Sequence, residues 1–548
     1  MIAVRSGALK VQAMKRSLFL ILGAGLVLSL LAGCGGSNPR TGTGVIRIGN
    51  GGEPRDLDPH TVSGVPEVKI INCLMEGLVA YHPTDDEIPY PGAAESWDLS
   101  EDGTTWTFHL REDGRWSNGD PVTAQDFVYS WRRVLAPGLG NEYADWMYMV
   151  KGAEAYHKGE MDDITRVGVY ADDDYTFRVE LNEPVADFLK VMLNHSFLPV
   201  HPPTIEKFGG PGVRQSGWTR PESYVGNGPY RLVKWEPDSV IRIERNPHYW
   251  DAGNVRTEAF EFYPISDENT ELRAFESGQL HITNSCPVNM REYYEQKFPD
   301  QIRFDPYAGV YFFRINTTRP PLDDVRVRQA LALSVDREQI IRRLLKGRER
   351  IATTYVPDGI GGYHPDPREG FNPGRARELL AEAGYPGGKG FPEVEVLFNT
   401  SDNHRKICEA IQNMWRQELG IGVALTNKEW KVYLNVTQNM QYDIARAGWI
   451  GNLYAYSFLR TLLSYSPNNE TGYDDPEFDR LVEASMHTLD DEANHELIRA
   501  AENRMLDYQP VIPLYWYTNI YLINPRIRNW HPKLLDQRPM KLVYLEEE

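Results

Sequence analysis

The sequence predicts a mixed α/β protein built in more than one lobe. Segments that alternate apolar and polar residues, as half-buried strands do, are interspersed with capped helices that carry one apolar stripe. One stretch runs strand, helix, strand, an order that implies two parallel strands joined by a right-handed crossover. Even without its first 33 residues the chain retains about 515, which is too many for a single core, so two or three domains are expected.

The first 33 residues have the pattern of an export signal. Lys15 and Arg16 precede an uncharged apolar run, Ser17 to Leu31, that is too short to span a bilayer. Small residues then lead to Cys34, a position that bacterial lipoprotein processing acylates. We therefore expect the mature chain to begin at Cys34 and to be held at a membrane by lipid, since several acyl chains give stable anchoring. The alternative is an ordinary signal with an incidental cysteine.

Charge and cysteine content exclude several classes of protein. Loss of residues 1–33 removes four basic residues and no acid, which moves the formal net charge from −19 to −23. Nucleic-acid binding needs a surface rich in Lys and Arg, so it is not expected. Besides Cys34 the chain holds only Cys73, Cys286 and Cys408, without a CxxC motif or a Cys/His cluster, so no metal site is expected. We interpret these three as buried free thiols, although a disulfide between two of them stays open.

The regular elements are expected after a flexible spacer at 34–44, which is rich in Gly, Ser and Thr. A helix begins after Thr123, which caps it together with Asp126 three residues later. Further helices begin after Asp336 and Asn372. The expected strands of the first half are 45–48, 105–110, 175–181 and 241–245. The strand–helix–strand unit comprises a strand at 393–398, a helix over about 404–419 that Gly420 ends, and a strand at 421–426.

No catalytic constellation rises above the background. The chain has no HExxH motif and no GxSxG elbow, and the glycine-rich stretch 384–390 has the wrong spacing for a phosphate-binding loop. The acidic pairs Asp323-Asp324 and Asp474-Asp475 fall at expected helix starts, where carboxylates suit the helix dipole, so we interpret them as caps. Neither an enzyme activity nor a cofactor is therefore expected.

Several longer motifs are much more specific. They are 94–97 (AESW), 106–111 (WTFHLR), 116–127 (WSNGDPVTAQDF), 226–230 (GNGPY), 245–250 (RNPHYW), 323–328 (DDVRVR), 399–402 (NTSD) and 445–449 (ARAGW). Together they strongly resemble the periplasmic oligopeptide-binding protein family, the receptors of peptide ABC importers. The resemblance covers essentially all of the mature chain.

The resemblance implies a bilobed periplasmic-binding-protein fold of the large three-domain type, with mixed sheets and a hinge between the lobes. Lobe I would be discontinuous, domain II would be inserted into it, and lobe II would be the third domain. The expected bounds are 45–65, 197–308 and 520–548 for lobe I, 66–196 for domain II and 309–519 for lobe II. A peptide would be enclosed between lobes I and II by hinge closure, with its backbone paired to the protein as an added strand.

Several positions match ligand contacts of the family. Glu53 belongs to the segment of lobe I that faces the ligand, Tyr143 comes from domain II, and Asn284 comes from lobe I. In lobe II, the strand that pairs with the peptide would be formed by Gly448, Trp449 and Ile450.

The remaining matches are side chains of lobe II. Trp430 and Trp449 resemble the indoles that wall side-chain pockets, while His404, Arg446 and Tyr517 match polar residues of the site. Taken alone, Trp430 is typical of a core residue and His404 of a surface histidine. The resemblance favours a ligand role for both.

One departure from the family pattern concerns the amino end of the ligand. Family members hold the peptide α-ammonium on an aspartate three residues after the tryptophan of the Arg-Ala-Gly-Trp motif, whereas Asn452 stands here after Trp449. An amide offers a dipole where a desolvated cation favours a full negative charge. Either another carboxylate such as Glu53 accepts the ammonium, or the ligand has none and is an N-blocked peptide, a cell-wall fragment or another solute.

Two further departures concern the pockets beside the pairing strand. Arg314 stands where related proteins carry a glutamate in a side-chain pocket, so this pocket is expected to favour acidic groups. Gly309 and Ile450 stand at the positions of the family's inter-strand disulfide, so that disulfide is not expected here.

The resemblance therefore implies a lipid-anchored receptor that captures oligopeptides and delivers them to an ABC importer. Its partners would be a peptide or peptide-like ligand, permease subunits with cytoplasmic ATPases, and the membrane reached through Cys34; it would act as a monomer. It would be exported to the periplasm or to the outer face of the cell membrane. The alternatives are a different ligand in the same cleft, and a sensor or chaperone role without transport.

Overall fold

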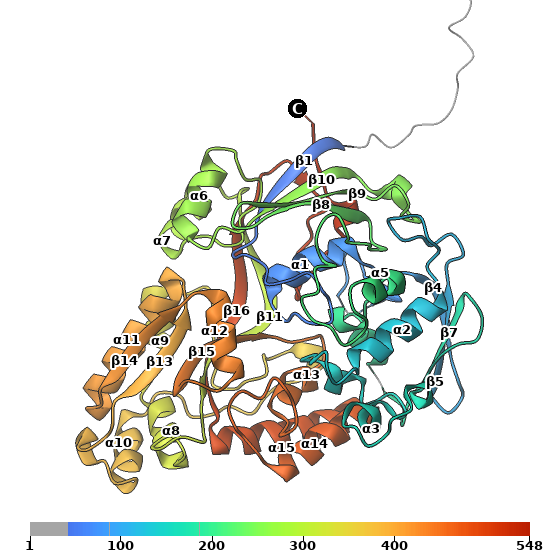
Figure 1. Cartoon of the computed structure of the whole chain (residues 1–548). Helices are drawn as coiled ribbons and strands as arrows, with labels where there is room; N and C mark the ends of the chain where they lie inside the picture. Colours follow the sequence, from blue (N-terminus) through green and yellow to red (C-terminus); the bar gives the residue numbers. More distant parts are fainter. Residues whose placement is uncertain (1–41, 87, 186, 548) are drawn as a thin grey trace, which may run out of the picture. The chain divides into compact units, whose positions relative to one another are not determined.

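Three β-sheets organise the part of the chain that the structure describes (Figure 1). The computed structural model describes residues 42–86, 88–185 and 187–547, so the expected signal and Cys34 lie outside the described residues. The expected α/β architecture with several sheets is confirmed. We refer to the N-terminal sheet, the middle sheet and the large sheet, in the order in which the chain enters them.

The N-terminal sheet has four strands. In spatial order they are β1 (Gly42–Gly49), β10 (Thr257–Tyr263), β9 (Val240–Arg245) and β8 (Tyr230–Glu236). β1 pairs with β10 in parallel, and the other pairs are antiparallel. Helix α1 (Val65–Leu74) buries Ile70, Ile71 and Leu74 in the same core as Ile46 and Ile48 of β1. α1 thus shares the core of this sheet, although the expected boundary at 65/66 assigns it to domain II.

The middle sheet is antiparallel throughout and lies between β1 and β8 in the sequence. In spatial order its strands are β4 (Ala94–Leu99), β5 (Thr105–Leu110), β7 (Thr176–Glu180) and β6 (Val169–Ala171). Helix α2 (Ala124–Val134) packs on β6 and β7 and buries Phe127 and Trp131. The expected capping box is confirmed, because the Thr123 N–H donates to Asp126 Oδ2 at 2.9 Å.

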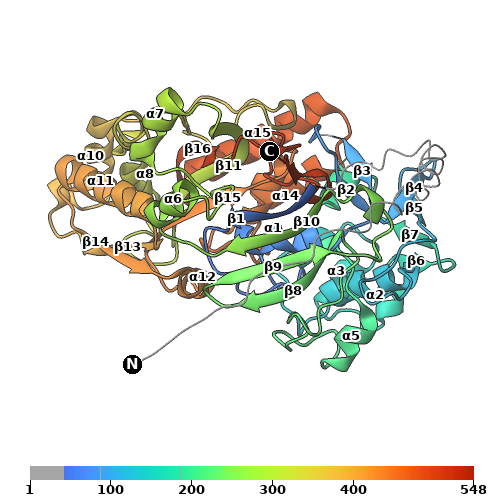
Figure 2. The same ribbon diagram turned by 90° about the horizontal axis from the view of Figure 1, so that it is seen from above.

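The large sheet has six strands and mixed directions. In spatial order they are β12 (Arg350–Ile351), β16 (Val511–Leu522), β11 (Ile302–Ile315), β15 (Ile444–Ile450), β13 (Val394–Asn399) and β14 (Val423–Lys428). β13 pairs in parallel with β14 and β15, whereas β11 is antiparallel to β15 and β16. The view from above shows this sheet and the middle sheet on opposite sides of the N-terminal sheet (Figure 2).

Most helix starts around the large sheet agree with their sequence signals. Asn372 caps α10 (Pro373–Glu382), and α11 (Asp402–Leu419) ends at Gly420 in the left-handed region, with φ +71°. The strand–helix–strand unit β13–α11–β14 is therefore confirmed, although α11 begins two residues earlier than expected because Ser401 caps it. The helix after Asp336 differs, since its short α-helical start, α9 (Arg337–Gln339), continues as a π turn, η5 (Ile340–Leu344).

One member of each acidic pair is confirmed as a cap. Asp324 caps α8 (Val325–Leu333), and Asp475 caps α14 (Pro476–His487), each by accepting from backbone N–H groups of the first turn. The remaining α-helices are α3 (Ala153–His157), α4 (Phe188–Val191), α5 (Pro202–Lys207), α6 (Glu268–Glu276), α7 (Val288–Lys297), α12 (Trp430–Gln438), α13 (Tyr456–Leu459) and α15 (Asp491–Tyr508). Two short pairs, β2 (Val79–Tyr81) with β3 (Pro89–Pro91) and β17 (Ile527–Arg528) with β18 (Tyr544–Leu545), complete the strands.

Strands β11 and β16 connect the large sheet to the region of the N-terminal sheet (Figure 1). At that end, Leu522 of β16 accepts from the Thr283 N–H at 2.9 Å, and Ile282 bridges to both Ile48 and Ile523. The pairing of β11 with β16 is interrupted between Pro306 and Val310. The expected boundaries 308/309 and 519/520 fall inside these two strands.

Two further sequence predictions concern cysteines and membrane spans. Cys73, Cys286 and Cys408 are buried and free, which confirms their interpretation and closes the question of a disulfide among them. In the region from 42 to 547, leaving out 87 and 186, no helix combines the length and apolar character that a membrane span needs.

Candidate functional site

A cavity of about 160 Å³ lies where two distant parts of the chain meet. One wall is formed by residues 63–65 at the start of α1, together with Glu142 and Tyr143. The opposite wall is formed by residues of α12 and β15, together with Arg314, Asn468 and Glu470. The cavity thus joins elements of the expected lobe I and domain II with elements of the expected lobe II. We call it the cleft cavity.

Strand β15 has an open edge at this cavity. Along one edge it pairs with β11 over its whole length, from Ile444 opposite Ile315 to Ile450 opposite Gly309. Along the other edge β13 pairs only with Ile444 and Ala445. Within the described chain, the edge from Arg446 to Ile450 therefore has no strand partner, and these residues line the cavity. An extended peptide can add to such an edge through backbone hydrogen bonds.

Arg446 is fixed by aromatic and amide partners. Its Nη2 donates to the Tyr517 hydroxyl at 2.9 Å, its Nη1 donates to Asn399 Oδ1 at 3.2 Å, and its guanidinium lies 4.7 Å from the Tyr311 ring centroid. His404 lies behind this group, with Nδ1 3.3 Å from the Tyr311 hydroxyl. Burial, together with the charge of Arg446, lowers the pKa of His404 well below its usual value, so its ring is neutral at pH 7.

Two indoles form an aromatic wall of the cavity. Trp430 begins α12 and stacks on Tyr433 one turn later, with ring centroids 5.7 Å apart and planes inclined by 14°, while Trp449 projects from β15. Among the described residues, the buried Nε1 atoms of Trp430 and Trp449 and the Nε atom of Arg446 have no hydrogen-bond partner. Buried donors are costly when unpaired. All three atoms belong to residues that line the cleft cavity, although the atoms themselves are buried within its wall.

The charge of Arg314 is not free in this structure. Its guanidinium forms an ion pair with Glu470, and both side chains are largely buried, 15% and 12% exposed. Both residues line the cleft cavity. The expectation that Arg314 makes its pocket favour acidic groups is therefore corrected, because Glu470, 156 positions later, already supplies the negative partner.

Glu53 and Asn284 do not belong to the lining of the cleft cavity. Both oxygens of Glu53 are engaged, since Trp235 Nε1 donates to one at 2.8 Å and the Asp238 N–H donates to the other at 3.1 Å. Asn284 accepts from Lys69 Nζ at 3.3 Å and donates its backbone N–H to Glu271. Glu53 is thus already committed to the β8–β9 hairpin as an acceptor, which leaves it poorly suited to bind a ligand ammonium.

Tyr143 lies in the lining of the cleft cavity, whereas Asn452 does not. Tyr143 lines the cavity, is 5% exposed, and meets Trp146 and His195 edge-on. Asn452 follows β15, donates its side-chain amide to the Tyr454 hydroxyl at 3.0 Å, and donates its backbone N–H to Ser457 Oγ. The structure therefore brings Tyr143, Arg314, Trp430, Arg446, Gly448, Trp449 and Ile450 together around one cavity, with His404, Tyr517 and Asn452 adjoining it.

Direct contacts close the cleft cavity on one side. Gln438 of α12 donates to Glu142 Oε1 at 2.7 Å, and Asn468 donates to the backbone carbonyl of Glu142 at 2.8 Å. The Tyr148 and Tyr465 rings stack across the same junction, with centroids 6.2 Å apart. The two walls are therefore in contact in this structure.

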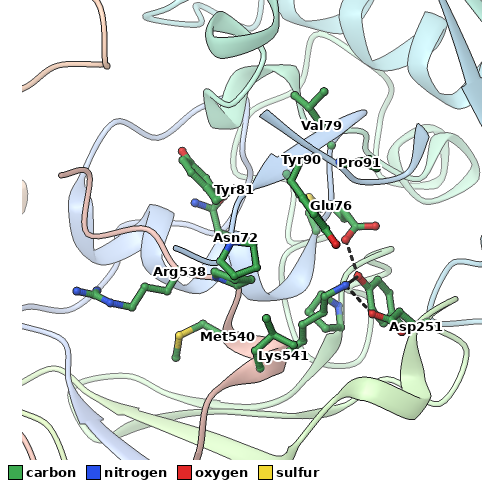
Figure 3. A pocket seen from close by; sticks show the side chains of 18 of the residues that line it. Asn72, Glu76, Val79, Tyr81, Tyr90, Pro91, Asp251, Arg538, Met540 and Lys541 are labelled. Atoms are coloured by element: carbon green, nitrogen blue, oxygen red, sulfur yellow. Dashed lines mark hydrogen bonds and ion pairs between the residues drawn. The ribbon is translucent and has the colours of Figure 1, made fainter. Parts of the chain in front are cut away.

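A second cavity, of about 220 Å³, lies away from the cleft and has a different character (Figure 3). Its wall is mainly apolar, and its charged groups satisfy one another. Glu76 accepts from the Tyr249 hydroxyl and from Trp250 Nε1, while Lys541 Nζ donates to Asp251 Oδ2 at 2.7 Å. The open edge of β15 favours the smaller cleft cavity as the functional site.

Comparison with known proteins decides the family. The model of bacterial extracellular solute-binding proteins, family 5 (middle region), matches residues 89–470. The periplasmic oligopeptide-binding protein OppA of Salmonella typhimurium is 36% identical over 549 residues, 96% of this chain and 98% of that protein. The chain belongs to this family. It is a family of solute-binding proteins rather than of enzymes.

Solved structures of the family share this fold. The Haemophilus influenzae OppA complex with the peptide RPPGFSPFR is 32% identical and covers 92% of this chain and 99% of its own, with a TM-score of 0.85. The Escherichia coli murein tripeptide-binding protein MppA is 31% identical, covers 93% and 99%, and gives 0.87. Its unliganded open form, at 32% identity and 92% and 97% coverage, gives only 0.63. MppA thus occurs in more than one arrangement, and this structure is less similar to its open form than to the other two structures.

Sequence reasoning missed several lining residues of the cleft cavity. Tyr433 follows Trp430 by three positions, a helical spacing that places both on one face. The sequence therefore contained a local signal for Tyr433. Glu142, Gln438 and Glu470 gave no local signal, because their partners lie far away in the sequence.

Proposed function

We propose that this family 5 protein is the receptor of an ABC importer and captures oligopeptides in the cleft cavity. The observation that carries the proposal is the open edge of β15 from Arg446 to Ile450 at that cavity. Backbone pairing gives affinity that does not depend on the ligand's side chains. The names of the relatives, which bind oligopeptides or a murein tripeptide, point the same way.

Capture and release require that the cleft opens. We assign the hinge to β11 and β16, which run between the two sides, with the interruption at Pro306 to Val310 as its compliant point. Lobe I, domain II and lobe II then keep the expected bounds, apart from α1. The lower TM-score with the open form of MppA supports this motion.

Export and anchoring complete the proposal. The signal pattern before Cys34 supports lipid attachment to that residue and a location in the periplasm or on the outer face of the cell membrane. Cys34→Ala is expected to release the receptor into the soluble extracytoplasmic fraction. Lipidation at Cys34 would be contradicted if the variant stays in the membrane fraction and its intact mass differs from that of the wild type only by the substitution.

A second candidate concerns the ligand and rests on Asn452. Its amide donates to Tyr454 and brings no negative charge to the end of β15, and Glu53 is occupied by Trp235 and Asp238. A ligand without a free α-ammonium, such as an N-blocked or cell-wall-derived peptide, fits this environment better. The same cleft could also present a closed receptor to a regulatory partner instead of a permease.

Mass spectrometry of the co-purified ligand tests the receptor function directly, and calorimetry tests the role of Asn452. Tetra-alanine with a free amine is expected to bind Asn452→Asp about tenfold more tightly than the wild type, whereas the N-acetylated peptide is not. Asn413→Asp, on the exposed face of α11, adds the same charge as a control. Tight binding of the free amine by the wild type, unchanged in Asn452→Asp, would reject the blocked ligand and leave the receptor function standing.

A further inference from the structure

A buried ion pair joins the two sides of the cleft outside the cavity itself. Asp145 lies in η1 (Ala144–Met147), two residues after the cavity residue Tyr143, and Arg460 begins η8 (Arg460–Leu462), ten residues after Ile450. Arg460 Nη2 lies 3.3 Å from Asp145 Oδ2, and the two side chains are only 2% and 1% exposed. The guanidinium also lies 4.6 Å from the Trp146 ring centroid.

This pair is incompletely satisfied. Within the described chain, Asp145 Oδ1 and the Nε and Nη1 atoms of Arg460 are buried and have no hydrogen-bond partner. The hydroxyl of the neighbouring Tyr456 is likewise buried without a partner. A well-formed arginine–carboxylate pair makes two parallel hydrogen bonds, so one contact of 3.3 Å is a poor exchange for the water that both charges lose.

The surroundings of the pair are apolar. Trp146 and Met147 on one side and Phe458 and Leu459 on the other belong to one continuous hydrophobic cluster. Burial raises the pKa of Asp145 in spite of the arginine beside it, which shows that desolvation outweighs the attraction. When the cleft opens, these charges return to water and regain their hydration.

We propose that the Asp145–Arg460 pair controls closure of the cleft. It fixes the register in which the two walls meet, and because its single contact of 3.3 Å does not replace the water that both charges lose, it keeps the unliganded cleft open. This inference rests on the proposed function, in which ligand binding closes the cleft. A bound peptide then supplies the free energy that closure alone lacks. The pair acts through the positions of the walls and does not touch the ligand.

This proposal predicts opposite effects for substitution of one member of the pair and of both members. Arg460→Met leaves Asp145 buried and unpaired on closure, so peptide binding is expected to weaken more than tenfold. Asp145→Leu combined with Arg460→Met removes both charges and fills the same space with apolar groups. The double variant is expected to bind at least as tightly as the wild type, with slower dissociation. Arg460→Lys, which keeps the charge, is expected to restore most of the affinity lost in Arg460→Met.

Small-angle scattering of the unliganded protein tests the role of the Asp145–Arg460 pair in closure. After removal of bound peptide by unfolding and refolding, the wild type is expected to be extended and the double variant measurably more compact. Affinities are measured with whichever of tetra-alanine and its N-acetylated form binds more tightly. If neither peptide binds, the proposed ligand is wrong, whereas the scattering result still tests the role of the Asp145–Arg460 pair in closure. A double variant no more compact than the wild type, or a wild type already compact without ligand, overturns it.

Discussion

Two buried aspartate–arginine pairs tie the region of the middle sheet to its neighbours, and they are built differently. Arg133 of α2 donates to both oxygens of Asp58, at 2.9 and 2.5 Å, and Trp218 Nε1 donates to the same carboxylate at 3.3 Å. Arg460 reaches only one oxygen of Asp145, at 3.3 Å. Both pairs are almost completely buried, so solvent exposure does not account for the difference.

The pKa values of the two carboxyl groups record this difference. Burial by itself raises the pKa of Asp58, but the charge and hydrogen bonds of Arg133, together with His60, outweigh burial, and the pKa is lowered. At Asp145 burial outweighs Arg460, and the pKa is raised. The first pair therefore suits a permanent contact between the middle sheet and the segment after β1. The second suits a contact that is broken and remade. In the proposed motion, the boundary that opens is the one at which charge pairing is poor.

The largest effect is expected at the permanent contact. Asp58→Asn leaves Arg133 buried beside a neutral amide and should lower the free energy of unfolding by about 3–5 kcal/mol. Asp145→Asn in the unliganded protein should lower it by less than about 1 kcal/mol, because both members of that pair are then in water. Urea denaturation at pH 7 measures both. Equal losses in the two variants would remove the contrast between the pairs.

A third buried carboxyl extends the comparison to a group held by neutral donors. Glu502 of α15 accepts from the N–H groups of Tyr355 and Val356 and from the Tyr363 hydroxyl. Burial raises its pKa from 4.5 to about 7. Between these pH values the folded protein retains a proton that the unfolded chain releases, so stability falls as pH rises from 4.5 to 7 and then levels off.

Glu502→Gln removes this pH dependence. Relative to the wild type, the variant should gain about 3 kcal/mol between pH 4.5 and pH 8, since each pKa unit corresponds to about 1.4 kcal/mol. Denaturation at both pH values measures the change. Glu496→Gln, exposed on the same helix, serves as the control. If the wild type and Glu502→Gln respond to pH alike, the carboxyl is ionised throughout.

Local signals in the sequence were sufficient for many elements of the fold. Thr123 and Asp126 predicted the start of α2, and Asn372 predicted that of α10, because caps act within one helical turn. The π turn after Asp336 was not predicted, since nothing in the periodicity distinguishes it from a continuing helix. The expected boundary places α1 in domain II, whereas α1 packs in the core of the N-terminal sheet, because the face that a helix buries is chosen by tertiary packing.

The candidate site was predictable where one strand supplies it. Gly448, Trp449 and Ile450 are consecutive, so a single motif located the open edge of β15. The pair Arg314–Glu470 and the pair Asp145–Arg460 were not predictable, because each joins residues more than 150 positions apart and depends on the final arrangement of the walls. Electrostatics across the cleft is therefore the part of the site that needs a structure.

A moderate effect, on ligand binding, is expected within one wall, away from the Asp58–Arg133 and Asp145–Arg460 pairs. A Cβ at Gly448 would lie 2.3 Å from the Tyr517 hydroxyl, which holds Arg446. Gly448→Ala should therefore displace Tyr517 and weaken peptide binding about tenfold, or about 1.4 kcal/mol. Gly422→Ala is the matched control, since its Cβ meets nothing within 4 Å. Calorimetry with the co-purified peptide measures both, and equal affinities would mean that the open edge of β15 does not touch the ligand.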